Sequence, residues 1–245
     1  NTAELPAMLP LTPHVGRAMA AWSADGTFVV TGDGEGTVRV FDATSGELRR
    51  SMQAGGQRLR AVAIDASSTR IVVAGEGSRA FVFNLQSPHP EPELVVEDIR
   101  AFSPRSIAFS PDNAFVILPG TQACHRVFRF PSMEEVRRIP TVRNSESLSA
   151  RFSPDGSLLA TNDRDRAVRL WRLPGFELIG TLRPDNLNPQ PWSFEFTPDS
   201  KEILLTTWNK DVELWDTTTL QRKLVFRGHG GLVTDVAAED ELSLE

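Results

Sequence analysis

One short phrase recurs along this chain at a nearly constant interval. It reads Phe-Ser-Pro-Asp at 109–112 and 152–155 and Phe-Thr-Pro-Asp at 196–199, and weaker copies stand at 22–25 and 64–67. The last residues of the five copies fall at positions 25, 67, 112, 155 and 199, so the steps are 42, 45, 43 and 44 residues. A period of about 40–45 residues built from short apolar segments is typical of four-stranded sheets that stack as blades around an axis. The interval therefore predicts an all-β propeller.

Each repeat contains four apolar runs separated by turn residues. Asp, Gly and Ser interrupt segments rich in Val, Phe and Thr, which is the pattern of successive hairpins. The second repeat also carries three prolines between 87 and 92, and we expect an extended surface connection there because proline cannot sit inside a ladder. We predict a single domain over 1–245 with five full four-stranded blades at approximately 17–52, 58–97, 104–139, 147–182 and 191–226, and a partial sixth at 232–245.

Five blades and part of a sixth do not complete a ring. A closed propeller hides the edges of all its blades, so we expect this chain to be a portion of a six- or seven-bladed ring. The remaining blades would come from additional domains or chains. The chain starts without a methionine and stops within a repeat, so we expect it to be part of a longer protein.

The third strand of a repeat supplies a second signature. Trp215-Asp216 ends one such strand, and Gly228-His229 precedes the start of the next repeat. Partial copies of the first pair are Trp171-Arg172, Phe41-Asp42 and Phe83-Asn84. With these pairs and the recurring phrase, nearly the whole chain resembles the WD40-repeat family. The resemblance implies a propeller that binds other proteins and performs no chemistry.

Members of that family often carry a hydrogen-bonded set of His, Ser or Thr, Asp and Trp within a blade. Here the set is incomplete everywhere. The fourth repeat offers Thr161, Asp165 and Trp171 without the histidine, and Asn209 replaces the expected Asp in the fifth. We therefore expect the blades to depend more on apolar packing than on this polar set.

Several residue patterns have a simple structural interpretation. The glycines at 32, 34 and 36 predict a tight hairpin turn, because no helix follows that could complete a phosphate-binding loop. We expect Asp112, Asp155 and Asp199 to accept backbone N–H bonds in turns. The remaining expectation concerns three tryptophans that should pack in the core: Trp22, Trp171 and Trp215.

Other residues are candidates for a binding face. Trp208 lies in a short expected turn, where it is either an interface anchor or folded back on a neighbouring blade. Trp192 opens a strand of the same repeat and alternates with Phe194 and Phe196, so packing is favoured for it over exposure at the face. Residues 137–172 hold eight arginines against four acids, and arginine is enriched at binding interfaces, although solvated blade rims would look similar. We predict a partner-binding face on blades three to five that uses Arg105, Arg164, Arg166, Trp192 and Trp208.

Composition limits the function classes. The net charge of −6 argues against general binding of nucleic acids or anionic membranes, and no apolar run is long enough to span a bilayer. The single cysteine, Cys124, excludes an internal disulfide, and with no visible secretory signal we expect a cytoplasmic protein. The four histidines have no short spacing typical of metal ligands, so we expect no metal and no cofactor.

Three functions fit this pattern. The first is a non-catalytic scaffold that binds proteins or peptides through one propeller face. The second is a regulatory or sensor module of a larger, possibly catalytic, multidomain protein. The third is a propeller enzyme, which would need converging groups such as Glu195 and arginines on the opening strands; we expect no enzyme here, because no catalytic grouping stands out.

Overall fold

The described part of the chain consists of strands joined by turns. A computed structural model describes residues 18–101, 107–120, 124–141, 147–163, 165, 167–184, 191–207, 210–231 and 233, with only the backbone at 147, 148, 191 and 192. The first three sheets contain β1 (Met19–Trp22), β2 (Phe28–Gly32), β3 (Thr37–Asp42) and β4 (Leu48–Gln53); β5 (Leu59–Ile64), β6 (Arg70–Gly75), β7 (Arg79–Asn84) and β8 (Leu94–Glu97); and β9 (Ala108–Phe109), β10 (Phe115–Gly120), β11 (Cys124–Arg129) and β12 (Glu134–Pro140). The last two contain β13 (Ser147–Phe152), β14 (Leu158–Asp163), β15 (Val168–Arg172) and β16 (Glu177–Leu182); and β17 (Pro191–Phe196), β18 (Glu202–Thr207), β19 (Val212–Asp216) and β20 (Arg222–Phe226).

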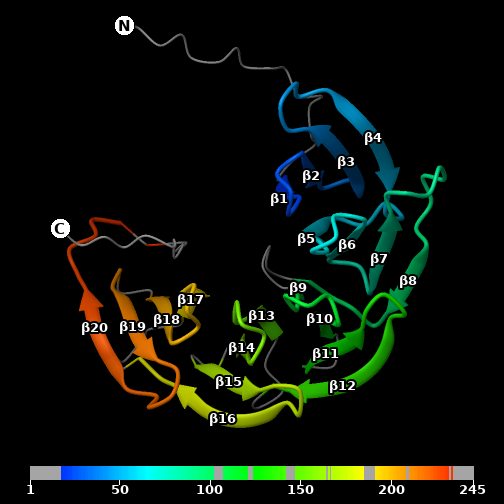
Figure 1. The fold of residues 1–245 in the computed structure, drawn as a ribbon. Helices are drawn as coiled ribbons and strands as arrows, with labels where there is room; N and C mark the ends of the chain where they lie inside the picture. Colours follow the sequence, from blue (N-terminus) through cyan, green and yellow to red (C-terminus); the bar gives the residue numbers. More distant parts are fainter. Residues whose placement is uncertain are drawn as a thin grey trace, which may run out of the picture.

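These strands form five antiparallel four-stranded blades, which confirms the predicted propeller architecture. In each blade the strands pair in chain order, and the first strand lies innermost (Figure 1). The innermost strands of successive blades contact one another. The described blades follow an arc that is open between the first and the fifth blade (Figure 1). The predicted partial blade at 232–245 lies almost entirely outside the described residues.

The core lies between the blades. The first and second blades share one cluster, in which Phe28 and Val30 of β2 meet Ile71 and Val73 of β6. Alternate residues of a strand point to opposite faces, so each sheet uses one face for the preceding blade and the other for the following blade. Both faces of a middle blade are thereby buried, which explains the nearly continuous apolar runs in the sequence.

The recurring phrase builds the turn between the first and second strands. Ser153 Oγ donates to Asp155 Oδ1 at 2.6 Å and accepts from the backbone N of Leu158 at 2.9 Å. Asp155 Oδ1 also accepts from the backbone N of Ser157 at 2.9 Å. The same bonds recur around Ser110 and Thr197, and Asp112 and Asp199 accept backbone N–H groups as predicted. The phrase recurs because its Ser or Thr hydroxyl and its Asp carboxylate supply the two oxygens that accept the backbone N–H groups of this turn.

These turns also link neighbouring blades. Ser68 Oγ accepts from the backbone N of Ala24 at 3.0 Å, and Asn113 Oδ1 accepts from the backbone N of Ala66 at 2.9 Å. Ser200 Oγ accepts from the backbone N of Asp155 at 3.1 Å. The three acceptors all have positive φ, between 56° and 62°. A turn residue in this left-handed conformation therefore reaches back to cap the turn of the preceding blade.

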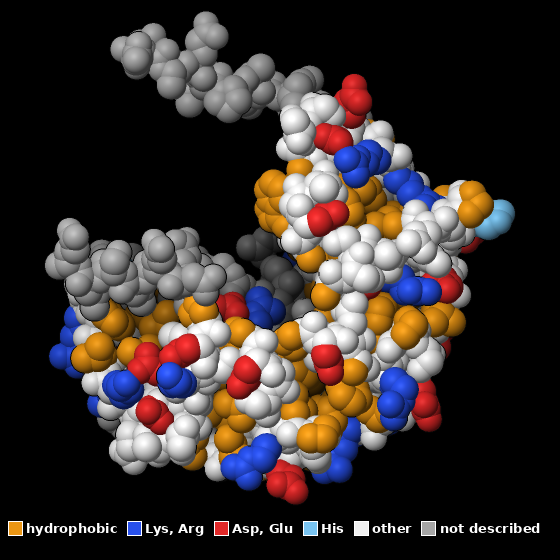
Figure 2. Space-filling model, viewed as in Figure 1, with side chains coloured by type: hydrophobic (Ala, Val, Ile, Leu, Met, Phe, Trp, Pro, Cys, Tyr) orange, Lys and Arg blue, Asp and Glu red, His pale blue; other side chains and the backbone are white. Residues whose placement is uncertain are grey.

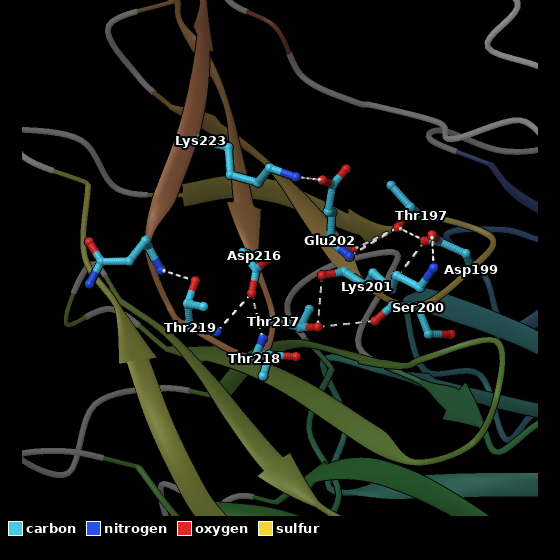
Figure 3. A network of polar contacts seen from close by, with 11 residues as sticks. Thr197, Asp199, Ser200, Lys201, Glu202, Asp216, Thr217, Thr218, Thr219 and Lys223 are labelled. Atoms are coloured by element: carbon cyan, nitrogen blue, oxygen red, sulfur yellow. Dashed lines mark hydrogen bonds and ion pairs between the residues drawn. The ribbon is translucent and has the colours of Figure 1, made fainter.

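The fifth blade shows how such a turn is supported from the other side. Thr217 Oγ1 donates to the carbonyl oxygens of Ser200 and Lys201 at 3.1 and 2.9 Å, while Asp216 Oδ1 accepts from the backbone N of Thr218 and Thr219 (Figure 3). These bonds join the β17–β18 turn to the β19–β20 turn. Both turns therefore lie at the same end of the blade.

The prediction that Trp22 lies in the core is wrong. Its side chain is 64% exposed, whereas Phe196, which holds the same place in the recurring phrase, is 2% exposed. Phe196 packs against the fourth blade through the face that the fifth blade turns toward its predecessor. Trp22 lies on the corresponding face of the first blade, beside Val29, and this face borders the open side of the arc. An aromatic side chain at this position of the repeat is therefore buried where a preceding blade covers it and exposed where none does.

Among the described residues, no blade covers the opposite face of the fifth blade either. Phe226 pairs with Val212 on β19, as Met52 pairs with Val38 on β3. Met52 is 2% exposed under the second blade, whereas Phe226 is 46% exposed. Both ends of the arc therefore present apolar sheet faces.

The glycine-rich stretch forms the predicted hairpin. Gly36 has φ +84° and its backbone N donates to the Asp33 carbonyl at 3.3 Å, which closes the turn between β2 and β3. All the elements in the described ranges are strands. Within those ranges no helix has the length and apolar character needed to cross a bilayer.

Candidate interaction face

The predicted face lies at one end of the blades. The upper end is defined here as the end where the first strand of each blade begins and the second strand is joined to the third. Arg105, Arg164, Arg166 and Trp208 lie outside the described residues, and Trp192 belongs to β17 without a described side chain. The roles of all five residues therefore stay predictions. Their described neighbours show how the upper end is built.

In the fourth blade an arginine clamps the turn that carries Arg164 and Arg166. Arg169 Nη1 lies 3.1 Å from Asp163 Oδ2 and 3.2 Å from Asp165 Oδ1, and Nη2 forms a second ion pair with Asp165. Asp163 Oδ1 also accepts from the backbone N of Asp165 at 3.0 Å. The clamp therefore holds the residues on both sides of Arg164.

The clamp consists of buried charges that compensate one another. Asp163 and Arg169 are 2% and 6% exposed. Burial opposes ionisation of Asp165, but hydrogen bonding with Asp163 and Arg169 and the charges of Arg169 and Arg183 outweigh it and lower the pKa of Asp165. A buried ion pair of this kind costs much to break, because the remaining charge would lack a partner. Asp163, Asp165 and Arg169 are therefore held in one geometry.

The first blade contains the same arrangement. Asp33 is 1% exposed, its Oδ1 accepts from the backbone N of Glu35 and Thr37, and its Oδ2 lies 3.2 Å from Arg39 Nη1. The sequence reasoning missed both clamps. Both ion pairs could have been predicted from one sequence pattern. In each case an Asp ends or follows the second strand, and an Arg stands six residues later on the third strand.

The turn that carries Trp208 is fixed differently. Thr207 is fully buried, and both its backbone N and its Oγ1 donate to the Asp211 carbonyl at 3.0 Å. The backbone N of Lys210 donates to the Thr207 carbonyl at 3.1 Å, and Lys210 has φ 71°. Thr207 and Lys210 thus have defined positions on either side of the segment in which the sequence places Trp208.

Two contacts join neighbouring blades, one near the predicted face and one toward the lower end of the blades. His125 of the third blade is buried and hydrogen-bonds with the backbone of Asn162 in the fourth blade. Arg151 Nε lies 3.2 Å from Glu195 Oε2, which connects the innermost strands β13 and β17. Glu195 and an arginine do converge, as the enzyme hypothesis required, but they form an interblade ion pair. Among the described residues no group of three or more His, Cys, Asp or Glu side chains could hold a metal ion.

The polar sets of the fourth and fifth blades differ from the family pattern. Trp171 Nε1 donates to Thr161 Oγ1 at 2.9 Å, while Asp165 is engaged by Arg169. Trp215 Nε1 donates to Glu213 Oε2 at 3.0 Å, and Glu213 is 1% exposed. Trp215 is buried as predicted, and Trp171 is half-buried.

Comparison with known proteins agrees with the architecture. The family described as "WD domain, G-beta repeat" matches residues 10–42 and 142–172. Two stretches of the chain, one at the start of the first blade and one in the fourth, thus match WD40 repeats. The resemblance drawn from the recurring phrase and the Trp-Asp pair is thereby confirmed.

Several curated proteins are similar to most of the chain. Actin-interacting protein 1 of Drosophila melanogaster is 25% identical over 219 residues, which cover 84% of this chain and 34% of the relative. WD repeat-containing protein 1 of Xenopus tropicalis is 26% identical over 211 residues, 81% of this chain and 33% of the relative. The target of rapamycin complex subunit LST8 of Rattus norvegicus is 25% identical over 181 residues, 70% of this chain and 54% of the relative. The chain spans about a third of the length of the first two relatives.

Proposed function

We propose that this WD40 module is a non-catalytic scaffold that binds proteins or peptides through the upper end of the third to fifth blades. The observation that carries the proposal is the Arg169 clamp on Asp163 and Asp165. The clamp fixes Asp163 and Asp165, which stand on either side of Arg164, and a binding loop with fixed neighbours loses less conformational entropy when a partner docks. The partner-binding residues of the proposal are Arg105, Arg164, Arg166, Trp192 and Trp208.

The face combines side chains that suit protein partners. Trp and Arg dominate the binding energy of protein interfaces, since they combine large apolar area with directional hydrogen bonds. Trp208 and Arg164 each directly follow the second strand of their blade, in neighbouring blades. We place the protein in the cytoplasm, where a chain with one thiol and no disulfide is stable.

A double substitution tests the proposed face. Trp208→Ala with Arg164→Ala should remove or strongly reduce proteins that co-purify with the tagged chain from its native cell. The matched control is Leu178→Ala with Arg172→Ala, because Leu178 and Arg172 are exposed near the lower end of the fourth blade. Partners unchanged in identity and amount in the upper-end variant would show that the face is wrong.

A second function is a regulatory module within a larger assembly. Two observations favour it: the apolar faces of the first and fifth blades are uncovered in the described part, and the relatives extend far beyond the matched region. In this version, additional domains or chains supply blades that complete the ring. Sedimentation of the isolated chain distinguishes the two, because uncovered apolar faces should cause self-association that a free-standing scaffold lacks.

A further inference from the structure

One acidic side chain at the upper end of the second blade has a different setting from its counterpart in the first. Glu76 directly follows β6, as Asp33 directly follows β2. The Asp33 side chain is 1% exposed and pairs with Arg39 of its own blade, whereas the Glu76 side chain is 42% exposed. Val82 stands six residues after Glu76, where the clamp of the first blade has its arginine. The carboxylate of the second blade therefore lies at the surface.

Three arginines converge on this carboxylate. Arg60 of the innermost strand β5 donates to Glu76 Oε1 from Nε at 2.9 Å, and its Nη2 bonds to the same oxygen. Arg58 Nε lies 4.0 Å from Glu76 Oε2, which is beyond hydrogen-bonding distance. Arg100 Nε donates to the backbone carbonyl oxygen of Glu76 at 3.2 Å. The hydrogen bond from Arg60 and the charges of all three arginines lower the pKa of Glu76, so its carboxylate is ionised at neutral pH.

This group of four side chains has a local excess of positive charge. Three guanidinium groups share one carboxylate, which leaves two positive charges in excess on a chain whose net charge is −6. On the face of the arc seen in Figure 2, by contrast, basic and acidic side chains lie interspersed. Arg58 and Arg100 are exposed, and the Arg58 side chain is 61% accessible. A ligand can therefore reach the guanidinium groups from solvent.

The segments that carry the cluster are joined by backbone hydrogen bonds. The backbone N of Glu76 donates to the Arg58 carbonyl at 3.0 Å. The backbone N of Ala101, next to Arg100, donates to the Gly75 carbonyl at 2.9 Å. The start of β5, the end of β6 and the connection to the third blade are thereby held together. A partner then loses little conformational entropy of the protein backbone when it docks here.

The cluster also continues the proposed binding face onto the second blade. Arg60 stands four residues before the recurring phrase of its repeat, and Arg105 and Trp192 stand four residues before the phrase in theirs. Equivalent positions of stacked repeats lie at the same end of the blades. The sequence therefore places Arg60 in register with two residues of the proposed face.

We propose that Arg58, Arg60 and Arg100 bind an acidic segment of the partner protein, one that carries at least two neighbouring carboxylates. Glu76 shows the fit, because its carboxylate already accepts hydrogen bonds from one guanidinium group of the cluster. The planar guanidinium matches a carboxylate in geometry as well as in charge. The inference rests on the proposed function, since it names the partner's chemistry on an extension of the same face.

The charge of the whole chain favours an acidic peptide over a nucleic acid. Nucleic-acid binding requires many phosphate contacts along a basic stripe, and a strongly negative chain repels such a polyanion. Here the three arginines form one compact cluster next to Glu76. A short acidic segment needs no larger basic surface than this.

Titration with short peptides tests the inference. The probes are a capped, fluorescent peptide of six glutamates and its counterpart of six glutamines, added to the intact chain and followed by fluorescence anisotropy. The glutamate peptide should bind saturably and at least about tenfold more tightly, because only its carboxylates form charge-assisted hydrogen bonds. The Nε–H signals of Arg58 and Arg100 should shift in NMR spectra of the labelled chain.

Two variants should change the affinity in opposite directions. Arg58→Gln with Arg100→Gln should weaken binding of the glutamate peptide at least about fivefold, and Glu76→Gln should strengthen it about two- to fivefold, because a competing carboxylate is removed. The matched control is Arg129→Gln with Arg172→Gln, which removes the same charge from exposed arginines at the lower ends of β11 and β15. It should leave the affinity within about twofold. Circular dichroism establishes that every variant is folded.

Three results would overturn the inference. The two peptides bind the chain equally, the variant of Arg58 and Arg100 binds the glutamate peptide as tightly as the parent, or single-stranded DNA of the same charge binds more tightly than the peptide. The variant with Trp208→Ala and Arg164→Ala should still bind the glutamate peptide, because it leaves the cluster intact. If that variant loses its cellular partners while the parent fails to bind the peptide, the acidic segment is refuted and the proposed function stands.

Discussion

A single hydroxyl shows how strongly individual residues shape these turns. Ser153 is fully buried and takes part in two short hydrogen bonds, with Asp155 and the Leu158 backbone. We expect Ser153→Ala to lower the free energy of unfolding by about 1–3 kcal/mol, because Leu158 N–H loses its partner. Urea denaturation measures the change. Ser157→Ala is the control, since Ser157 bonds to the same carboxylate from an exposed position and should cost less than about 0.5 kcal/mol. Equal losses would contradict the prediction.

His125 gives the protein a pH dependence. Burial lowers the pKa of its imidazole to about 4; the Asn162 backbone bond opposes this shift, and the charge of Arg169 adds to it. An unfolded histidine has a pKa near 6.5. As the pH falls below about 6.5, the unfolded state therefore gains a proton that the folded state excludes, and stability is lost. We expect the free energy of unfolding to fall by about 2 kcal/mol between pH 7 and pH 5.

The measurement is urea denaturation of the parent chain and of His125→Asn at both pH values. The variant should show a much smaller difference between them, whatever its absolute stability. The turn carboxylates Asp112 and Asp155 have lowered pKa values, so the stability they provide is lost at a more acidic pH. A parent and a variant with the same pH dependence would contradict the role of His125.

At the scale of elements, two strands approach so closely at one position that only glycine fits there. β6 ends at Gly75, which faces Leu59 where the β5–β6 register shifts. A Cβ at Gly75 would lie 1.9 Å from the Arg58 carbonyl oxygen. Glycine in a strand commonly marks such a backbone approach.

We therefore expect Gly75→Ala to separate the start of β5 from the end of β6. The clash should lower the free energy of unfolding by about 1–3 kcal/mol, as for other overpacked sites. Thermal or urea denaturation measures it. Gly230→Ala is the control, because nothing lies within 4 Å of a Cβ at that position. A neutral Gly75→Ala would mean that the two strands can move apart freely.

At the scale of the whole molecule, the position of a blade in the arc decides what a side chain contributes. Phe196 and Trp22 occupy the same place in their repeats, but only Phe196 is covered by a preceding blade. We expect Phe196→Ala to cost about 3–5 kcal/mol and Trp22→Ala less than about 1 kcal/mol by urea denaturation. Similar costs would show that another sheet covers the first blade in solution.

The sequence alone determined the repeat, the strand order and the turn chemistry. Those features are local: alternating apolar residues define strands, and the Ser-Pro-Asp phrase caps the same turn in each blade. The buried aspartates at 163 and 33 could also have been recognised, since their arginine partners stand six residues away on the adjacent strand.

Only the tertiary structure decided which apolar faces are covered and which loops are held. The sequence pattern predicts that Trp22 is a core residue, but its side chain is exposed. Burial at this position depends on a neighbouring blade, and no local sequence pattern indicates whether that blade is present. Likewise, the prolines at 88–92 indicate an exposed connection, but the arginine that anchors this connection, Arg50, comes from a blade more than thirty residues earlier. Contacts between blades join residues far apart in the chain, so they emerge only when the sheets are arranged in space.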